Sequence, residues 1–173
     1  MSKILALDPS LTAFGWAVME GQEIVECGCI KTNPLAKKQN IRKGDDRCRR
    51  ITEINTVLLG LMDKYQIKYI LSEQPHGSQS AVAAIMVGIV LGIIQTIADA
   101  KGIGVEWYSE GDCKDNLLGR RSASKTEGIA AVKRIFRYRL RGIKYFDEAV
   151  CDALAVYFYG MVFSPVIKML RQD

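Results

Sequence analysis

The sequence predicts a single α/β domain, residues 1–173, in which a mixed five-stranded sheet is flanked by helices. A length of 173 residues suits one domain that can bury a core without disulfide or zinc support. Three strand-like segments come first in close succession, and two more alternate with helical patterns. This order is typical of an antiparallel meander that helical crossovers connect to further strands of the same sheet.

The first three strands are predicted from apolar runs and from alternation. Residues 3–8 form a short apolar run of the kind found in a buried strand. A turn at Pro9 and Ser10 leads into residues 13–19 as the hairpin partner, and alternation across residues 23–30 predicts the third strand.

A loop and a long helix follow the meander. Residues 33–44 are expected to form a mobile loop that is rich in polar and basic side chains. Asp45 or Asp46 can cap the helix that follows, which continues to about Tyr65. Its apolar side chains share one helical face: Ile51, Ile54, Val57, Leu58 and Leu61.

The fourth strand is expected over residues 68–73, and a stretch without charge follows at 78–98. By length this stretch could just cross a bilayer. Gly88, Gly92 and Gln95 favour instead a helix that packs tightly against the sheet, as does the flanking strand pattern. We therefore expect no membrane partner.

The C-terminal part of the chain is predicted to contain one strand and three helices. The strand covers residues 104–108, and a short helix follows at 113–118. A basic loop at 119–125 leads into a helix that ends near Arg137, and the last helix is expected over 146–170.

Composition narrows the chemistry and the compartment. The net charge of +5 and the pI near 9.0 favour a polyanionic partner. Five cysteines without a C-x-x-C pair do not resemble a disulfide framework, and no signal peptide pattern opens the chain, so a cytoplasmic location is expected. His76 is the only histidine, which excludes zinc sites built on two or more histidines and leaves one ring for any Ser-His-Asp triad.

Acidic residues occupy the ends of two predicted strands. Asp8 ends the first strand and Glu73 ends the fourth, while Asp152 lies within the apolar start of the last helix. Carboxylates in such places are costly to bury unless a cation joins them, which predicts a divalent metal site. For each acid alone, a turn, a cap or a favourable place in the first turn of a helix is an equally good explanation.

Two-metal phosphodiester hydrolysis requires several converging carboxylates, and two more are available near Asp152. Glu148 precedes Asp152 by four residues, so both can share one helical face. Asp147 points elsewhere unless it precedes the first helical turn. Two Mg²⁺ ions held roughly 3.5 to 4 Å apart would activate a water and stabilise the leaving oxygen.

Basic residues form three runs that could follow a phosphate backbone. A solvated surface is the plainer explanation for any one run. Lys125 is distinctive because it lies at a predicted helix start, where backbone N–H groups also favour an anion. The runs are Lys37, Lys38, Arg42, Lys43, Arg47, Arg49 and Arg50; then Arg120, Arg121 and Lys125; then Lys133, Arg134, Arg137, Arg139, Arg141 and Lys144.

With these motifs in order, the chain resembles the RuvC family of Holliday junction resolvases, within the RNase H-like nucleases. The resemblance extends over nearly the whole chain, and each motif is weak alone. The matching segments are Ile4-Leu5-Ala6-Leu7-Asp8-Pro9, Gly15-Trp16-Ala17-Val18, Ser72-Glu73-Gln74, Leu117-Leu118-Gly119, Ala123-Ser124-Lys125 and Asp152-Ala153-Leu154-Ala155.

The resemblance implies an RNase H-like fold, a homodimer, and Mg²⁺-dependent cleavage of four-way DNA junctions, with Mn²⁺ as a possible substitute. It implies that Asp8, Glu73 and Asp152 are metal ligands. It also implies that Lys114 and Lys125 lie near the scissile phosphate or the junction backbone, and the neighbouring Arg120 and Arg121 are further candidates for DNA binding.

The chain departs from the family pattern at two informative places. The family usually has Asp or His three residues before the final Asp, where this chain has Ala149. That role would pass to Glu148 or Asp147. Where an aromatic residue often follows the Glu-Gln pair, this chain has His76, which we expect to stack on a base near the junction centre.

The sequence therefore predicts a structure-selective endodeoxyribonuclease in which Asp8, Glu73, Asp152 and Glu148 (or Asp147) hold Mg²⁺ and Lys125 stabilises the phosphate. Two alternatives stay open at this point. One is a branched-DNA-binding module of the same fold without catalysis, suggested by Ala149. The other is an actin-like or sugar-kinase-type phosphotransferase, which would need a second domain.

Overall fold

The computed structural model describes residues 2–35, 39–75 and 80–170, and its centre is a five-stranded mixed sheet. The strand order is β3-β2-β1-β4-β5, which confirms the predicted fold class. The strands are β1 (Lys3–Asp8), β2 (Ala13–Glu20), β3 (Glu23–Lys31), β4 (Tyr69–Gln74) and β5 (Gly104–Ser109).

The first three strands form the predicted antiparallel meander. In the register of β1 and β2, Leu7 pairs with Trp16 and Asp8 with Gly15. β4 lies parallel to β1 on the other side, with Leu7 opposite Ser72, and β5 lies parallel to β4. The carboxyl ends of β1, β4 and β5 therefore lie at the same edge of the sheet.

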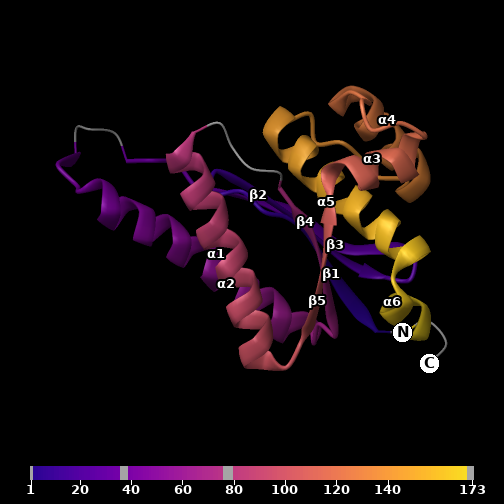
Figure 1. Ribbon diagram of the computed structural model, residues 1–173, viewed down its shortest axis with the longest axis horizontal. Helices are drawn as coiled ribbons and strands as arrows, with labels where there is room; N and C mark the ends of the chain where they lie inside the picture. The colour runs from indigo at the N-terminus through magenta and orange to yellow at the C-terminus, as the bar shows by residue number, and fades with distance from the viewer. Residues whose placement is uncertain (1, 36–38, 76–79, 171–173) are drawn as a thin grey trace.

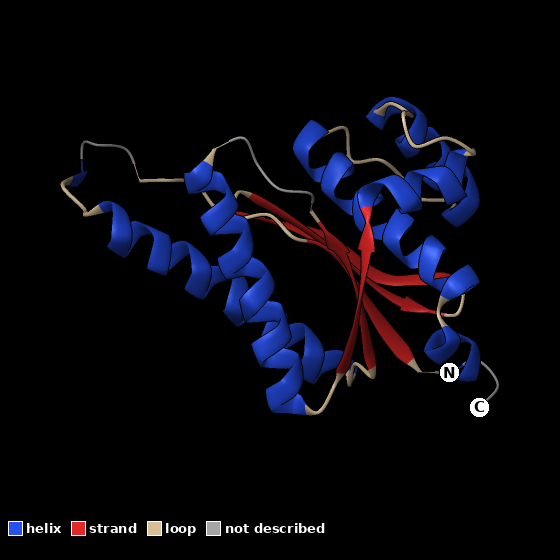
Figure 2. Ribbon diagram, viewed as in Figure 1, coloured by secondary structure: helices blue, strands red, loops and turns tan. Residues whose placement is uncertain are grey.

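Helices cover both faces of the sheet (Figures 1 and 2). Helices α1 (Lys43–Tyr65) and α2 (Ala81–Lys101) pack on one face. Four helices pack on the other face: α3 (Glu110–Leu118), α4 (Lys125–Phe136), α5 (Lys144–Phe163) and α6 (Pro165–Leu170).

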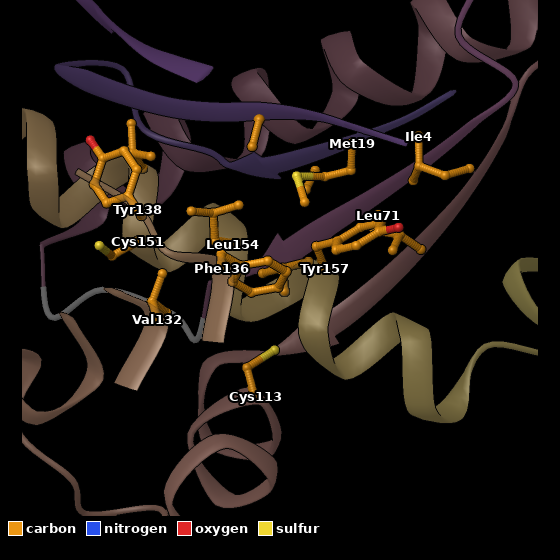
Figure 3. Close-up of a cluster of buried hydrophobic side chains, with 14 of the residues drawn as sticks. Ile4, Met19, Leu71, Cys113, Val132, Phe136, Tyr138, Cys151, Leu154 and Tyr157 are labelled. Atoms are coloured by element: carbon orange, nitrogen blue, oxygen red, sulfur yellow. The ribbon is translucent and has the colours of Figure 1, made fainter. Parts of the chain in front are cut away.

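Each face of the sheet buries its own apolar cluster. Leu5, Leu7 and Ile70 point toward α1 and α2. Ile4, Ala6, Met19 and Leu71 point the other way, toward α5, and Figure 3 shows Ile4, Met19 and Leu71 with side chains of the covering helices. Because side chains alternate along a strand, the face of these buried residues also gives the face of the other residues in the same strand.

Helix α2 differs from the prediction of a tightly packed central helix. Only Val90, Ile94 and Ala98 are buried among its residues. This 21-residue helix is long and apolar enough to cross a membrane, by length and composition only, and core helices of globular proteins meet the same criterion. Here α2 packs against the sheet and α1, and Lys101 contacts Asp63 of α1 at 2.5 Å.

Two predicted boundaries are wrong. Helix α1 begins before Asp45 and Asp46, which lie in its first turn, and its N-cap residue Arg42 provides no side-chain cap. The helix dipole explains why the two acids favour that first turn. The single helix expected over 146–170 is broken at Ser164, because Pro165 has no N–H to donate and disfavours helical backbone before it.

The loop expected over 33–44 lies partly outside the described residues, which omit 36–38.

Candidate active site

The carboxylates of Asp8 and Glu73 lie side by side on one face of the sheet. Leu7 and Ser72 are direct partners in the parallel register, so the next residues of both strands are Asp8 and Glu73. Alternation places both on the same face as Ala6 and Leu71, which is the face that α5 covers. Asp8 and Glu73 are therefore neighbours in the structure, as their places at the ends of the two strands predicted.

Helix α5 lies unusually close to the sheet beside these strand ends. Gly15 pairs with Asp8, and a methyl group in place of its hydrogen would collide with the carbonyl oxygen of Ala149 on α5. Only glycine permits this approach. The approach brings Glu148 and Asp152, one helical turn apart, over the carboxyl ends of β1 and β4.

The acids share one cavity of about 330 Å³. Its lining joins three strand ends to the start of α4 and the first turns of α5. The lining residues are Asp8, Ser10, Ala13, Glu73, Glu110, Lys125, Tyr145, Glu148, Ala149 and Asp152. Four of the acids predicted from the sequence, Asp8, Glu73, Glu148 and Asp152, thus come together from three separate elements.

Burial and then crowding raise the pKa values of Asp8, Glu73 and Asp152. Burial raises the pKa of Asp8 well above its usual range, and the charges of Asp152 and Glu73 raise it further. Burial, followed by Asp152 and Glu110, raises the pKa of Glu73 to about 7. Burial also raises the pKa of Asp152, although Lys125 opposes that effect. Added positive charge would relieve this repulsion.

Lys125 is the cation that faces this group. It is the first residue of α4, whose N-terminus is closed by a capping box between Ser124 and Glu127. Its Nζ lies 3.1 Å from Oδ2 of Asp152. Burial lowers the pKa of Lys125, but Asp152 and then Asp8 outweigh that effect, so its pKa is raised and the ammonium stays charged.

Glu110 belongs to the site, and the sequence analysis missed it. It follows β5 directly as the first residue of α3, so Asp8, Glu73 and Glu110 mark the ends of three consecutive parallel strands. Its carboxylate contacts Nζ of Lys114 at 2.5 Å. The strand-end pattern that singled out Asp8 and Glu73 also marks Glu110, but the short helix was expected to begin three residues later.

Asp147 does not reach the cavity, which corrects the expectation that it could be a metal ligand. It is buried, and its carboxylate accepts hydrogen bonds from the Tyr138 hydroxyl at 3.2 Å and from the N–H groups of Arg141 and Gly142 at 2.9 and 2.8 Å. Of the two acids that could replace the usual ligand near Ala149, Glu148 is the one that lines the cavity.

The residues expected to bind DNA are distributed around the site. Lys114 is held by Glu110, whereas Arg120 pairs with Glu127 and Arg121 pairs with Asp112 on the surface. His76 lies outside the described residues.

Two further cavities continue from the acids toward α1. A cavity of about 390 Å³ shares Asp8, Ser10 and Glu73 with the first and extends to Arg50 and the start of α2. The next, of about 570 Å³, shares Arg50 with it and adds Arg42, Lys43 and Arg47. The acid cavity thus has neighbouring cavities that several cations line.

The donor set is suited to a hard divalent cation. The acidic groups offer carboxylate oxygens, the ligand type that Mg²⁺ and Mn²⁺ prefer. The pKa of Glu73 is raised by burial and then by repulsion from Asp152 and Glu110, and a bound cation would relieve that repulsion. Within residues 2–35, 39–75 and 80–170, no three such side chains approach closely enough to enclose an ion together. Binding would therefore require these side chains to move closer together.

Residues 4–158 match the family model described as crossover junction endodeoxyribonuclease RuvC. The chain is 30% identical over 158 residues to the RuvC of Endomicrobium trichonymphae, covering 88% of this chain and 77% of that one. It is 23% identical to the RuvC of Ehrlichia chaffeensis, covering 88% and 94%.

Two solved structures share the fold. T. thermophilus RuvC in complex with Holliday junction substrate superposes with a TM-score of 0.73 at 19% identity, covering 95% of this chain and 96% of that chain. The yeast mitochondrial Holliday junction resolvase has a TM-score of 0.63 at 12% identity, covering 99% of this chain and 82% of that one.

Proposed function

Since the chain belongs to the RuvC family of crossover junction endodeoxyribonucleases, we propose that it resolves four-way DNA junctions by hydrolysing phosphodiester bonds in the cavity of Asp8, Glu73 and Asp152. The chain is a nuclease by family, and relatives of this family are metal-dependent. The choice of metal, the residue roles and the assembly are parts of the proposal. We place its action in the cytoplasm of a bacterial cell or a phage-infected host.

One observation carries the residue assignment: acids from β1, β4 and α5 meet in one partly buried cavity that contains a single lysine. Such a cluster costs stability, because each carboxylate raises the pKa of its neighbours. Acidic residues that the fold keeps close together despite their mutual repulsion, so that their pKa values are perturbed, are typical of a catalytic centre.

Asp8, Glu73 and Asp152 would hold Mg²⁺, with Glu148 and Glu110 at the same cavity as further oxygen donors. The proposal is for two ions at each site, and Mn²⁺ would be accepted in their place. When bound, the ions supply Lewis-acid stabilisation of the charge that develops on the phosphate oxygens.

Lys125 would bind a non-bridging oxygen of the phosphate. Asp152 orients it through the 3.1 Å contact, and the raised pKa keeps the proton on Nζ. Ser10 and Tyr145 line the same cavity and would limit how deeply the backbone enters. The chain's own groups thus position one phosphate beside the carboxylates.

We further propose that the enzyme is a homodimer whose two subunits contact each other through α2. This helix exposes Val82, Ile85 and Ile89, of which Ile85 is 58% exposed. These positions follow a helical spacing of three and four residues, so they form one apolar stripe. A two-fold enzyme would present two cavities to the two-fold arrangement of a four-way junction.

A labelled synthetic junction tests the catalytic assignment. Asp8→Asn keeps the size of the side chain and removes its charge, and Asp63→Asn on the surface of α1 is the matched control. We expect Asp8→Asn to slow single-turnover cleavage in Mg²⁺ by at least about 100-fold while junction binding stays intact. The control should cleave like the wild type.

Cleavage by Asp8→Asn at the wild-type rate would exclude the assignment. If the wild type itself binds junctions tightly but cuts none in either Mg²⁺ or Mn²⁺, the chain is a branched-DNA-binding module without catalysis. ATP turnover in the absence of DNA would instead favour the phosphotransferase.

A further inference from the structure

A run of arginines outside the acid cavity has no role in the proposed catalysis. It lies in the segment between α4 and α5, residues 137–143, which we call the arginine loop. Arg137, Arg139 and Arg141 alternate there with Tyr138 and Leu140. With cations at the end of α4 and the start of α5, the group comprises Lys133, Arg134, Arg137, Arg139, Arg141 and Lys144, and all six are exposed.

These six cations differ in their ion pairing from the arginines of the preceding basic loop. No ion pair joins any of them to an acid within the part of the chain that the structure describes. Arg120 and Arg121, in the preceding basic loop, are each paired with a carboxylate. A surface whose charge is left unpaired is suited to an anionic partner from outside.

The three arginines face a common space. Arg137, Arg139 and Arg141 line one cavity of about 740 Å³, formed between the arginine loop and the turn that connects β2 to β3. Glu23 is the only acid in its lining, so the cationic groups outnumber it.

The arginine loop is held in a defined shape by Asp147. The buried carboxylate accepts hydrogen bonds from the Arg141 and Gly142 N–H groups and from the Tyr138 hydroxyl. Arg137 adopts a left-handed conformation with φ of 52°, which is unfavourable for a residue with a side chain. Arg137 is the C-cap residue of α4, where a left-handed conformation commonly ends a helix, and the hydrogen bonds to Asp147 hold the residues that follow it.

The arginine loop is also connected to the acid cavity. It leads directly into the first turns of α5, where Tyr145 and Glu148 line that cavity. Cys27, which lies in the arginine cavity, is two residues along β3 from Cys29, the residue in register with Gly15 beside Asp8. Cys27 therefore lies two strands across the sheet and two residues along it from Asp8, which corresponds to a distance of roughly 12 Å.

We propose that the arginine loop binds the sugar–phosphate backbone of a duplex arm that leaves the cleavage site past β3. Guanidinium groups can bind phosphate through two parallel hydrogen bonds. Such contacts with the backbone do not depend on the base sequence. Asp147 is a positioning residue for this contact and takes no part in metal binding. The inference rests on the proposed function, because it assumes that the phosphate cut lies in the acid cavity.

The test compares two triple variants that lose the same charge. One is Arg137→Gln, Arg139→Gln and Arg141→Gln together. The control is Lys68→Gln, Lys101→Gln and Lys168→Gln, three exposed lysines that line neither the arginine cavity nor the acid cavity. The dissociation constant for a synthetic junction is measured over a series of salt concentrations without divalent metal, and cleavage is measured separately at saturating protein.

We expect the arginine variant to reduce the slope of log affinity against log salt by about 2 to 3, since each lost phosphate contact contributes about 0.9. Affinity should fall at least about 10-fold at low salt. Cleavage at saturation should stay within about 2-fold of the wild type, and the control should change the slope by less than about 1.

Asp147→Asn tests positioning separately from charge. If Asp147 acts through the arginines, its effect on junction affinity should largely disappear when the three arginines are already replaced. A purely structural role would lower the melting temperature and weaken affinity equally in both backgrounds. That result would remove Asp147 from the proposal.

An arginine variant with the wild-type salt slope would overturn the inference. Failure of the proposed function would look different. If the wild type never cuts a junction but binds duplex DNA through the three arginines, the arginine surface stands and the resolvase assignment falls.

Discussion

Replacing Glu73 by Gln should make the metal-free protein more stable at pH 8 while abolishing cleavage. Glu73 lies against Asp8 at the end of β4, and burial with the charges of Asp152 and Glu110 raises its pKa from 4.5 to about 7. A group whose pKa is raised on folding favours the folded state only while it is protonated. The stability it contributes is complete below about pH 4.5 and is lost as the pH rises to about 7.

The size of the effect follows from the pKa change. A rise from 4.5 to about 7 corresponds to about 3 kcal/mol lost by pH 8. Glutamine carries no charge but must bury an amide, which costs about 1 kcal/mol of this gain. A net gain of about 2 kcal/mol in a domain of this size raises the melting temperature by about 4 to 8 °C.

Thermal unfolding in EDTA at pH 5 and at pH 8 measures this difference. Glu73→Gln should melt close to the wild type at pH 5 and above it at pH 8. Glu23→Gln is the control, because Glu23 is exposed on β3 and its replacement should change stability by less than about 0.5 kcal/mol. Added Mg²⁺ should stabilise the wild type more than Glu73→Gln, because under the proposed function the ion would bind the carboxylate that the variant lacks.

A Glu73→Gln protein that melts below the wild type at pH 8 in EDTA would refute this prediction. An equal difference in melting temperature at both pH values would also refute it, because the ionisation of Glu73 would then have no effect on the stability of the folded state.

Three other substitutions have defined outcomes. Lys125→Met should slow single-turnover cleavage about 100-fold with little change in junction affinity, and an unchanged rate would remove Lys125 from catalysis. Ile85→Glu should convert a dimer to a monomer in sedimentation experiments, whereas a persistent dimer would place the interface away from this part of α2. Gly15→Ala should lower the free energy of unfolding by about 1 to 3 kcal/mol because its methyl group meets Ala149; Gly88→Ala, which meets no atom, should not.

The sequence by itself was sufficient for the order of the elements and for most of the acids. Residues 3–8 and 68–73 are apolar runs that end in a carboxylate, and a strand with that pattern carries its acid to the edge of the sheet wherever it pairs. Lys125 was marked by its place at a helix start. These features depend on neighbours within a few residues, so local patterns are sufficient to find them.

Tertiary packing decided which candidate residues share a cavity. Asp147 and Glu148 are adjacent in the chain, and both are acids in the first turns of α5. The close approach of α5 to Gly15 turns Glu148 toward the strand ends and leaves Asp147 to hold the arginine loop. Glu110 joined the site only because β5 lies beside β4 and α3 begins at once after it.

The physical reason is the range of the interactions. Strand and helix periodicity arises from backbone geometry within one segment, so it can be read from that segment. The surroundings of a carboxylate depend on residues that are far away in the chain and meet it only after the helices have packed on the sheet. The sequence determined which acids were available, and the approach of α5 to the sheet decided which of them face one another.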